Sequence, residues 1–120
     1  MSAKKVLYVF SQAPYSNATG LEGLDAVLVG AAFEQQISLL FLNDGVFQLK
    51  KQQDVSSTPI KEYTKTFLAL NDFEIDNIYT HDLSMQARGL QGDDLIIATQ
   101  ALTSAQVSDL IAEQYRVFTF

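Results

Sequence analysis

The sequence predicts a single α/β domain, residues 1–120, in which about five strands form a mostly parallel sheet with helices on both faces. Short apolar runs rich in β-branched and aromatic residues, beginning with VLYVF at residues 6–10, are typical of strands buried on both faces. Amphipathic helical patterns separate these runs, and such alternation requires crossover connections and therefore parallel strands. A chain of 120 residues that is 48% hydrophobic can bury one core but is too short for two ordinary domains.

The first half of the chain is expected to contain two strands around one helix. Thr19 is a candidate N-cap for that helix, and Glu22 would complete a capping box. The apolar stripe of the helix comprises Leu24, Val27, Leu28 and Ala31. Residues 37–42 (ISLLFL) are the second strand, and Asn43-Asp44-Gly45 is a turn in which the glycine is expected to need a positive φ. A β-hairpin into VFQL stays possible here, although we favour an open strand-to-helix turn.

The second half of the chain continues the alternation after a polar surface loop at residues 50–58. Thr58 and Pro59 predict a helix start, because proline at the first helical position loses no intrahelical hydrogen bond. The expected buried face of this helix is Ile60, Tyr63, Phe67 and Leu70. EIDNIYT, which ends at Thr80, and LIIA (residues 95–98) are read as the third and fourth strands, and YRVFTF (residues 115–120) as the last. Thr103 and Gln106 form a capping box for the final helix, whose inward residues are Val107, Leu110 and Ile111.

Charge and cysteine content exclude several classes of function. The chain has 14 acidic and 8 basic residues, a formal net charge of -6, and no basic cluster, so direct nucleic-acid binding is not expected. It has no cysteine, which excludes disulfides, thiolate metal sites and cysteine nucleophiles within the chain. The apolar run near the N-terminus is too short for a signal peptide or a membrane-spanning helix. We therefore expect a cytoplasmic protein without membrane contact.

The turn that follows the third strand, THDLSMQARGL, holds the only histidine of the chain. Asp82 is expected to cap a helix over residues 83–88, with Gly89 just past its end and Leu90 folding back onto it. The favoured interpretation of His81 is a partly buried, hydrogen-bonded side chain at a strand end, and a proton-transfer or interface role stays open. A triad with Ser84 and Asp82 is disfavoured, because contiguous residues at a helix start rarely give the base contact with both neighbours.

Other candidate sites are weaker. Asp93-Asp94 has no supporting histidine, so no metal site is expected, and the loop at residues 11–19 lacks the glycine spacing of a phosphate cradle, so no cofactor is expected. Asp44-Gly45 could hold a ligand at a strand end, although turn chemistry explains both residues. Tyr15 and Phe47 lie in turns, and they are candidates for burial against another subunit or against the core.

Two segments of the sequence carry a resemblance to a known family: FSQAPYSNATGLEGLDA at residues 10–26 and NDGVFQL at residues 43–49. Together with the turn HDLSMQARGL, in which Arg88 and Gly89 are a weaker marker, they resemble the DsrE/DsrF-like sulfur-carrier family. Within it, the resemblance is to the TusC (DsrF-type) subunits, and it covers nearly the whole chain. The resemblance implies the DsrE/F-like version of the α/β fold.

The resemblance also implies a function and partners. In this family TusB-like, TusC-like and TusD-like subunits assemble, which implies a hetero-oligomer and a heterohexamer as its form, and a cysteine on the TusD-like subunit carries persulfide sulfur. The relay leads to 2-thiolation of the tRNA wobble uridine or, in sulfur-oxidising bacteria, to a Dsr pathway. The family's cysteine position falls on His81, which implies a non-catalytic docking subunit. The alternative from the residues alone is a free-standing α/β domain that binds a small molecule or nucleotide.

Overall fold

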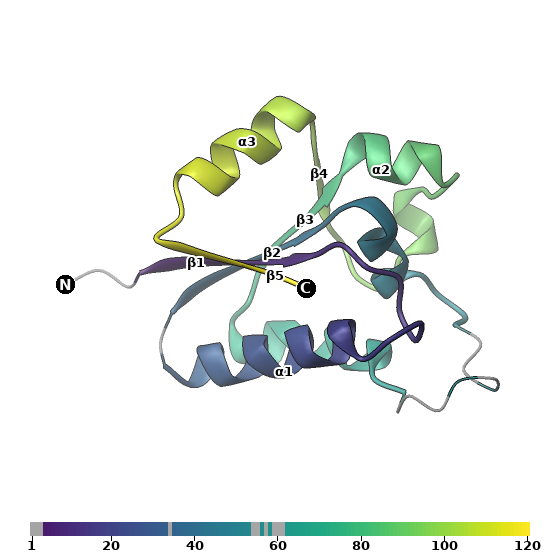
Figure 1. Ribbon diagram of the computed structural model, residues 1–120, viewed down its shortest axis with the longest axis horizontal. Helices are drawn as coiled ribbons and strands as arrows, with labels where there is room; N and C mark the ends of the chain where they lie inside the picture. Colours follow the sequence, from purple (N-terminus) through teal and green to yellow (C-terminus); the bar gives the residue numbers. More distant parts are fainter. Residues whose placement is uncertain (1–3, 34, 54–55, 57, 59–61) are drawn as a thin grey trace.

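A five-stranded sheet with the order β4-β3-β2-β1-β5 forms the centre of the molecule (Figure 1). The computed structural model describes residues 4–33, 35–53, 56, 58 and 62–120. The strands are β1 (Lys5–Phe10), β2 (Gln36–Phe41), β3 (Asn77–His81), β4 (Gln100–Leu102) and β5 (Arg116–Thr119). Every neighbouring pair in this order is parallel. The predicted α/β class with a parallel sheet is confirmed.

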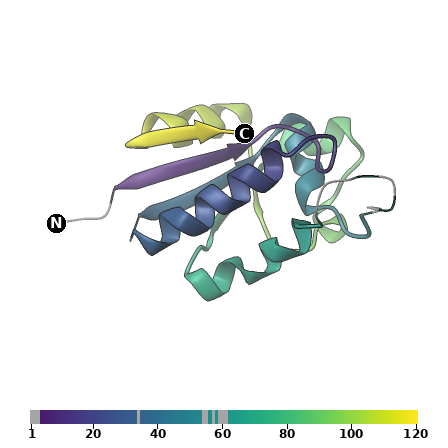
Figure 2. The ribbon, with the colours of Figure 1, turned by 60° about the horizontal axis from the view of Figure 1, so that its bottom comes forward.

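Helices cover both faces of the sheet (Figures 1 and 2). The α-helices are α1 (Thr19–Ala32), α2 (Asp82–Ala87) and α3 (Ser104–Ala112), and the 3₁₀ helices are η1 (Asn43–Leu49), η2 (Thr64–Phe73) and η3 (Gly92–Asp94). In both views α1 and η2 lie on one side of the sheet and α3 lies on the other. The short helices η1 and α2 sit at the carboxyl ends of the strands, where they contact each other.

The larger part of the core lies between the sheet and the α1 and η2 layer. Phe10 stacks on Phe41 with ring centroids 5.0 Å apart, and Phe67 of η2 meets both rings edge-on. Offset and edge-to-face pairs of this kind add to the stabilisation from burial. The opposite face has a smaller core, in which Leu110 of α3 packs with Leu7 and its neighbours. The full burial of residues 6–10 therefore matches the prediction of a strand covered on both sides.

The turn after β2 is open, as favoured from the sequence, because η1 follows at once and β2 pairs only with the parallel strands β1 and β3. The expected positive φ at Gly45 is wrong. Asn43 has the positive φ, 51°, a conformation that asparagine tolerates better than most residues. Gly45 is needed for a different reason, since a Cβ there would overlap the carbonyl oxygen of Phe10.

Two predictions of local structure are wrong. The N-cap of α1 is Ala18 and makes no side-chain hydrogen bond, so the capping box of Thr19 and Glu22 does not form. The amide of Thr19 instead donates to the side chain of Asn17 at 2.9 Å. Residues 95–98 are not a strand: Leu95 makes only an isolated antiparallel bridge to Lys50, and the chain joins the sheet later, as β4.

Other expectations about the helices are met in part. The capping box of Thr103 and Gln106 at the start of α3 is confirmed. The helix predicted from Thr58 begins later, at Thr64, with Tyr63 as its N-cap, so the predicted helix start is wrong. Tyr63, Phe67 and Leu70 are buried as predicted, whereas Pro59 and Ile60 lie outside the described residues. In α3, Leu110 is buried, but Ile111 is 40% exposed and does not line the core. Among the described helices, none has the length and apolar composition needed to cross a membrane.

Candidate functional site at the ends of strands β2 and β3

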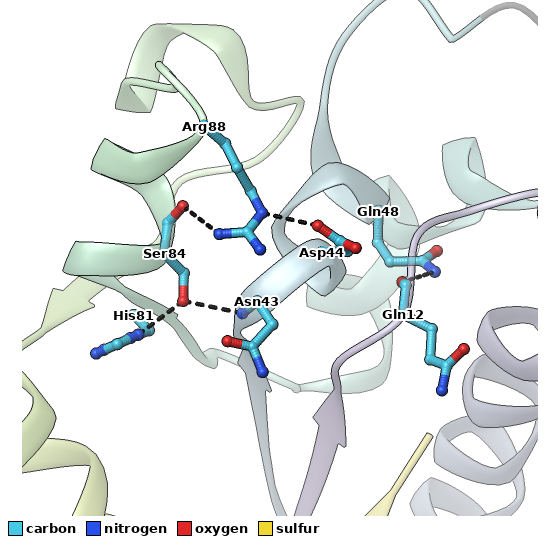
Figure 3. Close-up of polar contacts among 7 residues, drawn as sticks. All are labelled: Gln12, Asn43, Asp44, Gln48, His81, Ser84 and Arg88. Atoms are coloured by element: carbon cyan, nitrogen blue, oxygen red, sulfur yellow. Dashed lines mark hydrogen bonds and ion pairs between the residues drawn. The ribbon is translucent and has the colours of Figure 1, made fainter.

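The carboxyl ends of β2 and β3 bring together side chains from η1 and α2 (Figure 3). Ligands and reacting groups of open α/β sheets gather at this edge, because the strand-to-helix connections all leave from it. His81 ends β3, while Asn43 and Asp44 open η1 directly after β2. Ser84 and Arg88, at the two ends of α2, complete the group. Both turns follow predicted strands, and the structure shows them in contact.

His81 is held by a hydroxyl on each side of its ring. Its Nδ1 lies 2.7 Å from Oγ of Ser84, and its Nε2 lies 2.8 Å from Oγ of Ser104 at the start of α3. Ser84 is buried, with 4% of its surface exposed, whereas the Ser104 contact is at the surface. The imidazole thus links α2 and α3 across the carboxyl end of β3.

Ser84 connects His81 to the backbone of η1. The backbone N–H of Asn43 donates to Oγ of Ser84 at 2.9 Å (Figure 3). With Nε2 protonated, the hydroxyl of Ser84 donates to Nδ1 and Nε2–H donates to Oγ of Ser104; with Nδ1 protonated, both directions reverse. In both cases each ring nitrogen has a partner. His81 is therefore a connecting side chain that fits the favoured interpretation of a partly buried, hydrogen-bonded histidine.

The helix after His81 begins one residue earlier than predicted. His81 is the N-cap of α2, and Asp82 is its first residue, with its carboxylate accepting the N–H of Leu83 at 2.6 Å. At the other end Gly89 has a φ of 66°, and the N–H of Leu90 donates to the carbonyl of Met85 at 3.0 Å. This is a Schellman-type end with a buried hydrophobic residue after the glycine, as predicted.

Arg88 connects α2 to η1 at the rim of the site. Its Nε donates to Oδ1 of Asp44 at 2.9 Å, and its Nη1 donates to the carbonyl oxygen of Ser84 at 3.1 Å (Figure 3). The Arg88 side chain is 23% exposed and that of Asp44 is 59% exposed, so solvent weakens the pair. The ion pair mainly orients the two side chains. It connects the turn of Asp44 to the end of α2, and it holds a carboxylate and a guanidinium at the surface.

A second polar network lies on the α1 side of the same edge. Gln48 is fully buried, donates from Nε2 to the carbonyl of Gln12 at 3.0 Å, and accepts the hydroxyl of Tyr63 at 2.6 Å. Burial raises the pKa of Tyr63 to about 12, although its hydrogen bond to Gln48 acts in the opposite direction. This network ties the loop after β1 to η1 and η2.

Tyr15 and Phe47, the candidate interface aromatics, are partly buried against the larger core. The hydroxyl of Tyr15 lies 3.2 Å from the amide nitrogens of Tyr63 and Thr64 and accepts from both, so it caps the start of η2. The large exposed apolar side chains of the described residues are other residues, on α1, η2, α2, α3 and β5. Contact of Tyr15 and Phe47 with another subunit stays a prediction.

The hydrogen bonds at the ends of β2 and β3 hold polar side chains in fixed positions at the surface. Ser84 and His81 are in hydrogen-bond contact, but the carboxylate of Asp82 contacts its own helix, so the third contact of a triad is not made. Asp94 is used in the cap of η3, where it accepts the N–H of Gln91 at 2.8 Å. Among the described residues, no group of three or more histidine or acidic side chains could hold a metal ion.

Sequence reasoning missed the long-range partners in both networks. Ser104 contacts His81 from 23 positions further along the chain, and Gln48 meets Tyr63 from 15 positions away. No local spacing signals such pairs. The one available sign for Ser104 was the capping box at Thr103, because it places the first turn of α3 directly after the carboxyl end of a strand that neighbours β3.

Comparison with known proteins decides the family. The model of the DsrE/DsrF-like family matches residues 4–120. The chain belongs to the DsrE/DsrF-like family. It is 39% identical to the intracellular sulfur oxidation protein DsrF of Allochromatium vinosum, a match that covers 98% of this chain and 96% of that protein. It is 33% identical to a TusC homolog of Vibrio vulnificus, over 97% of this chain and 98% of that protein.

Solved structures confirm the fold of this DsrE/DsrF-like chain. The ychN protein of E. coli superposes with a TM-score of 0.81 and 18% identity, over 98% of this chain and 99% of that one. A protein of unknown function from Methanobacterium thermoautotrophicum gives a TM-score of 0.67 and 14% identity over the same shares. The fold expected from the resemblance is therefore correct.

Proposed function

We propose that this DsrE/DsrF-like chain is a non-catalytic subunit of a sulfur-relay complex, with TusB-like and TusD-like subunits as its partners. The observation that carries the proposal is His81 at the strand-end turn of a chain that contains no cysteine. Neither an imidazole nor the two hydroxyls that bind it can form a persulfide. A partner's thiol must therefore carry the sulfur, and this chain contributes docking and orientation.

The names of the relatives support a sulfur relay and leave two pathways. The relatives named TusC homolog agree with the TusC-type resemblance. That resemblance implies a relay that ends in 2-thiolation of the tRNA wobble uridine, which is our first candidate. The relative named DsrF, at 39% identity, favours intracellular sulfur oxidation as the second. In both pathways the complex works in the cytoplasm, and the net charge of -6 gives this chain little affinity for tRNA itself.

The strand-end edge is the surface that we assign to the partner carrying the thiol. Arg88 and Asp44 are fixed to each other there, and Leu83 of α2 offers an apolar side chain that is 55% exposed. A guanidinium next to the incoming thiol would favour its thiolate or persulfide anion. Tyr15 and Phe47 remain candidates for a second subunit contact, because the side chains of both are only partly buried.

The test is co-expression of the three chains, followed by mass measurement with light scattering and transfer of labelled sulfur from a persulfide donor. We expect one complex in which a partner cysteine becomes labelled and this chain does not. Reductant-sensitive label on the wild-type chain would contradict the proposal. If the chain stayed monomeric and bound neither partner at micromolar concentration, the result would instead favour the free-standing binding domain.

A gain-of-function variant makes the test sharper. His81→Cys places a thiol at the turn that corresponds to the family's cysteine position, and we expect it to accept label within the complex. Ser104→Cys is the matched control, since it places an exposed thiol beside the ring of His81 but on α3. Equal labelling of both variants would show general thiol exchange and would remove support for a specific relay position. Deletion strains assayed for 2-thiouridine and for sulfur oxidation would separate the two pathways.

A further inference from the structure

Strand β5 leaves one edge of the sheet open. It pairs with β1 alone and is the last strand in the order β4-β3-β2-β1-β5. All four of its residues are exposed. Natural edge strands are usually protected by shortness, charged residues, proline, a bulge or a covering element. Strand β5 is four residues long and carries one charge, Arg116, at its start, and no charge or proline follows in VFT. Beyond Arg116 the edge exposes the apolar side chains of Val117 and Phe118, and such an edge can pair with another chain.

An apolar groove runs beside this edge, between β5 and α1. It has a volume of about 370 Å³, with Tyr8 and Phe120 among the residues that line it. Three further lining side chains are large, apolar and exposed: Val29 at 59%, Phe33 at 73% and Phe118 at 38%. A concentration of exposed apolar side chains around one groove marks an interaction surface. The groove and the open edge are continuous, because Phe118 belongs to both.

Among the described residues that line the groove, one is charged, Asp25. Helix α1 runs against the strand direction, since Gly23 lies against Phe120 while Gly30 lies against Tyr8. Asp25 therefore lines the half of the groove near the carboxyl end of β5.

Two basic residues lie outside the lining of the groove, near the start of β5. At the amino-terminal end of β5, Lys4 and Arg116 surround the exposed ring of Tyr115, at 4.1 and 5.8 Å from its centroid. These are two of only eight basic residues in the chain. Their position gives the surface a direction, acidic at one end and basic at the other.

We propose that a second copy of this chain occupies the surface, with the two β5 edges paired antiparallel about a twofold axis. An antiparallel pairing brings the basic end of one copy to the acidic end of the other, so the charge pattern is complementary to itself. Each copy would place Phe118 at the other's groove, and the two sheets would form one continuous sheet. This contact is separate from the strand-end edge assigned to the relay partners, so a complex with two copies of this subunit can contain both contacts.

The oligomeric state of the purified full chain tests the proposal. We expect sedimentation equilibrium to show a dimer that dissociates on dilution. Phe118→Glu should weaken the dimer at least about tenfold, because it puts a charge into an apolar contact. The ring of Phe118 also packs on the buried Tyr8, with ring centroids 5.6 Å apart, so the fold of this variant has to be checked. Leu68→Glu, which changes an apolar side chain of η2 that is 55% exposed, is the matched control and should have no effect. Circular dichroism would check that each variant is folded, and Val29→Glu is the replacement if Phe118→Glu is not.

A charge exchange distinguishes a twofold dimer from other associations. Arg116→Glu and Asp25→Arg should each weaken the dimer, and the double variant should recover most of the wild-type affinity. A monomer at all concentrations, or a dimer unaffected by Phe118→Glu, would overturn the proposal. Failure of the double variant to recover would overturn the antiparallel twofold arrangement. If the edge instead bound only TusB-like or TusD-like chains, the second-copy proposal would fail while the relay proposal stood.

Discussion

Removal of the imidazole of His81 should destabilise the chain by about 1 to 2 kcal/mol without preventing assembly. His81→Ala removes two hydrogen bonds, and the surroundings of the two serines make their costs unequal. Ser104 is exposed, so water replaces its partner at little cost. Ser84 is 4% exposed, so water replaces the lost imidazole poorly, while its oxygen keeps the N–H of Asn43. Nearly all of the cost should therefore come from the Ser84 side.

Urea unfolding and thermal melting would measure this change. At roughly 2.1 cal/mol/K per residue, a chain of 120 residues loses about 4 °C of melting temperature for each kcal/mol. Ser84→Ala should cost about as much as His81→Ala, because it leaves the amide of Asn43 unpaired. Ser104→Ala should change stability by no more than about 0.5 kcal/mol.

A double-mutant cycle isolates the contact itself. His81→Ala combined with Ser84→Ala should show a coupling energy of about 1 kcal/mol, whereas the cycle with Ser104→Ala should be close to additive. The reasoning would be refuted if Ser104→Ala cost as much as Ser84→Ala, or if the two cycles gave the same coupling. If His81→Ala left the complex intact by size-exclusion chromatography but abolished thiolation in cells, the purely connecting role of His81 would be wrong.

Two further predictions concern the rest of the strand-end edge. Gly45→Ala should cost more than about 3 kcal/mol, because its methyl group meets the carbonyl oxygen of Phe10 and the backbone has to move; a melting temperature within a few degrees of wild type would contradict this. Tyr63 should make stability fall at high pH. Its folded pKa of about 12 lies above the unfolded value of about 10, so its contribution is complete below pH 10 and about 2 to 3 kcal/mol is lost as the pH rises to 12. Tyr63→Phe should be less stable at neutral pH and should show a smaller alkaline loss, and an unchanged alkaline slope would show that this tyrosine is not responsible.

The sequence predicted the sheet well because burial on both faces leaves a strong local signal. Residues 6–10 are apolar without a break, and this pattern is unusual for any element other than a central strand. The same criterion failed at residues 95–98. LIIA has the composition of a strand, but Leu95 alone is fully buried there, because the segment packs beside η1 and its amide at Ile96 bonds to the carbonyl of Leu49. Composition reports burial and does not report which partner supplies the hydrogen bonds.

Turn residues predicted the backbone conformation where neighbouring residues determine it. They failed where contacts with distant parts of the chain determine it. Gly89 adopts the left-handed conformation that the helix end requires, and neighbouring residues alone determine this. Gly45 is required by the approach of β1, which is far away in the sequence, so the local explanation was wrong. The candidate site follows the same rule. His81 was identified from its position, whereas Ser104 could only be found once α3 was placed across the end of β3.

The pairing of β5 with β1 also has a consequence for the order of folding. The hydroxyl of Ser11 donates to the carbonyl of Phe120 from 109 positions away, and the β1–β5 ladder closes a loop of similar length. Closing so long a loop costs more chain entropy than forming the β1–β2 and β2–β3 pairs, which join strands that follow each other in the sequence. We therefore expect β5 to dock after the main barrier has been crossed, so that substitutions at Val117 speed unfolding and leave the folding rate almost unchanged. Stopped-flow kinetics would contradict this order if the folding rate of such a variant decreased enough to account for its whole loss of stability. Until β5 docks, the apolar strand β1 is itself the edge of the sheet, and that intermediate interval is when the chain is most exposed to aggregation.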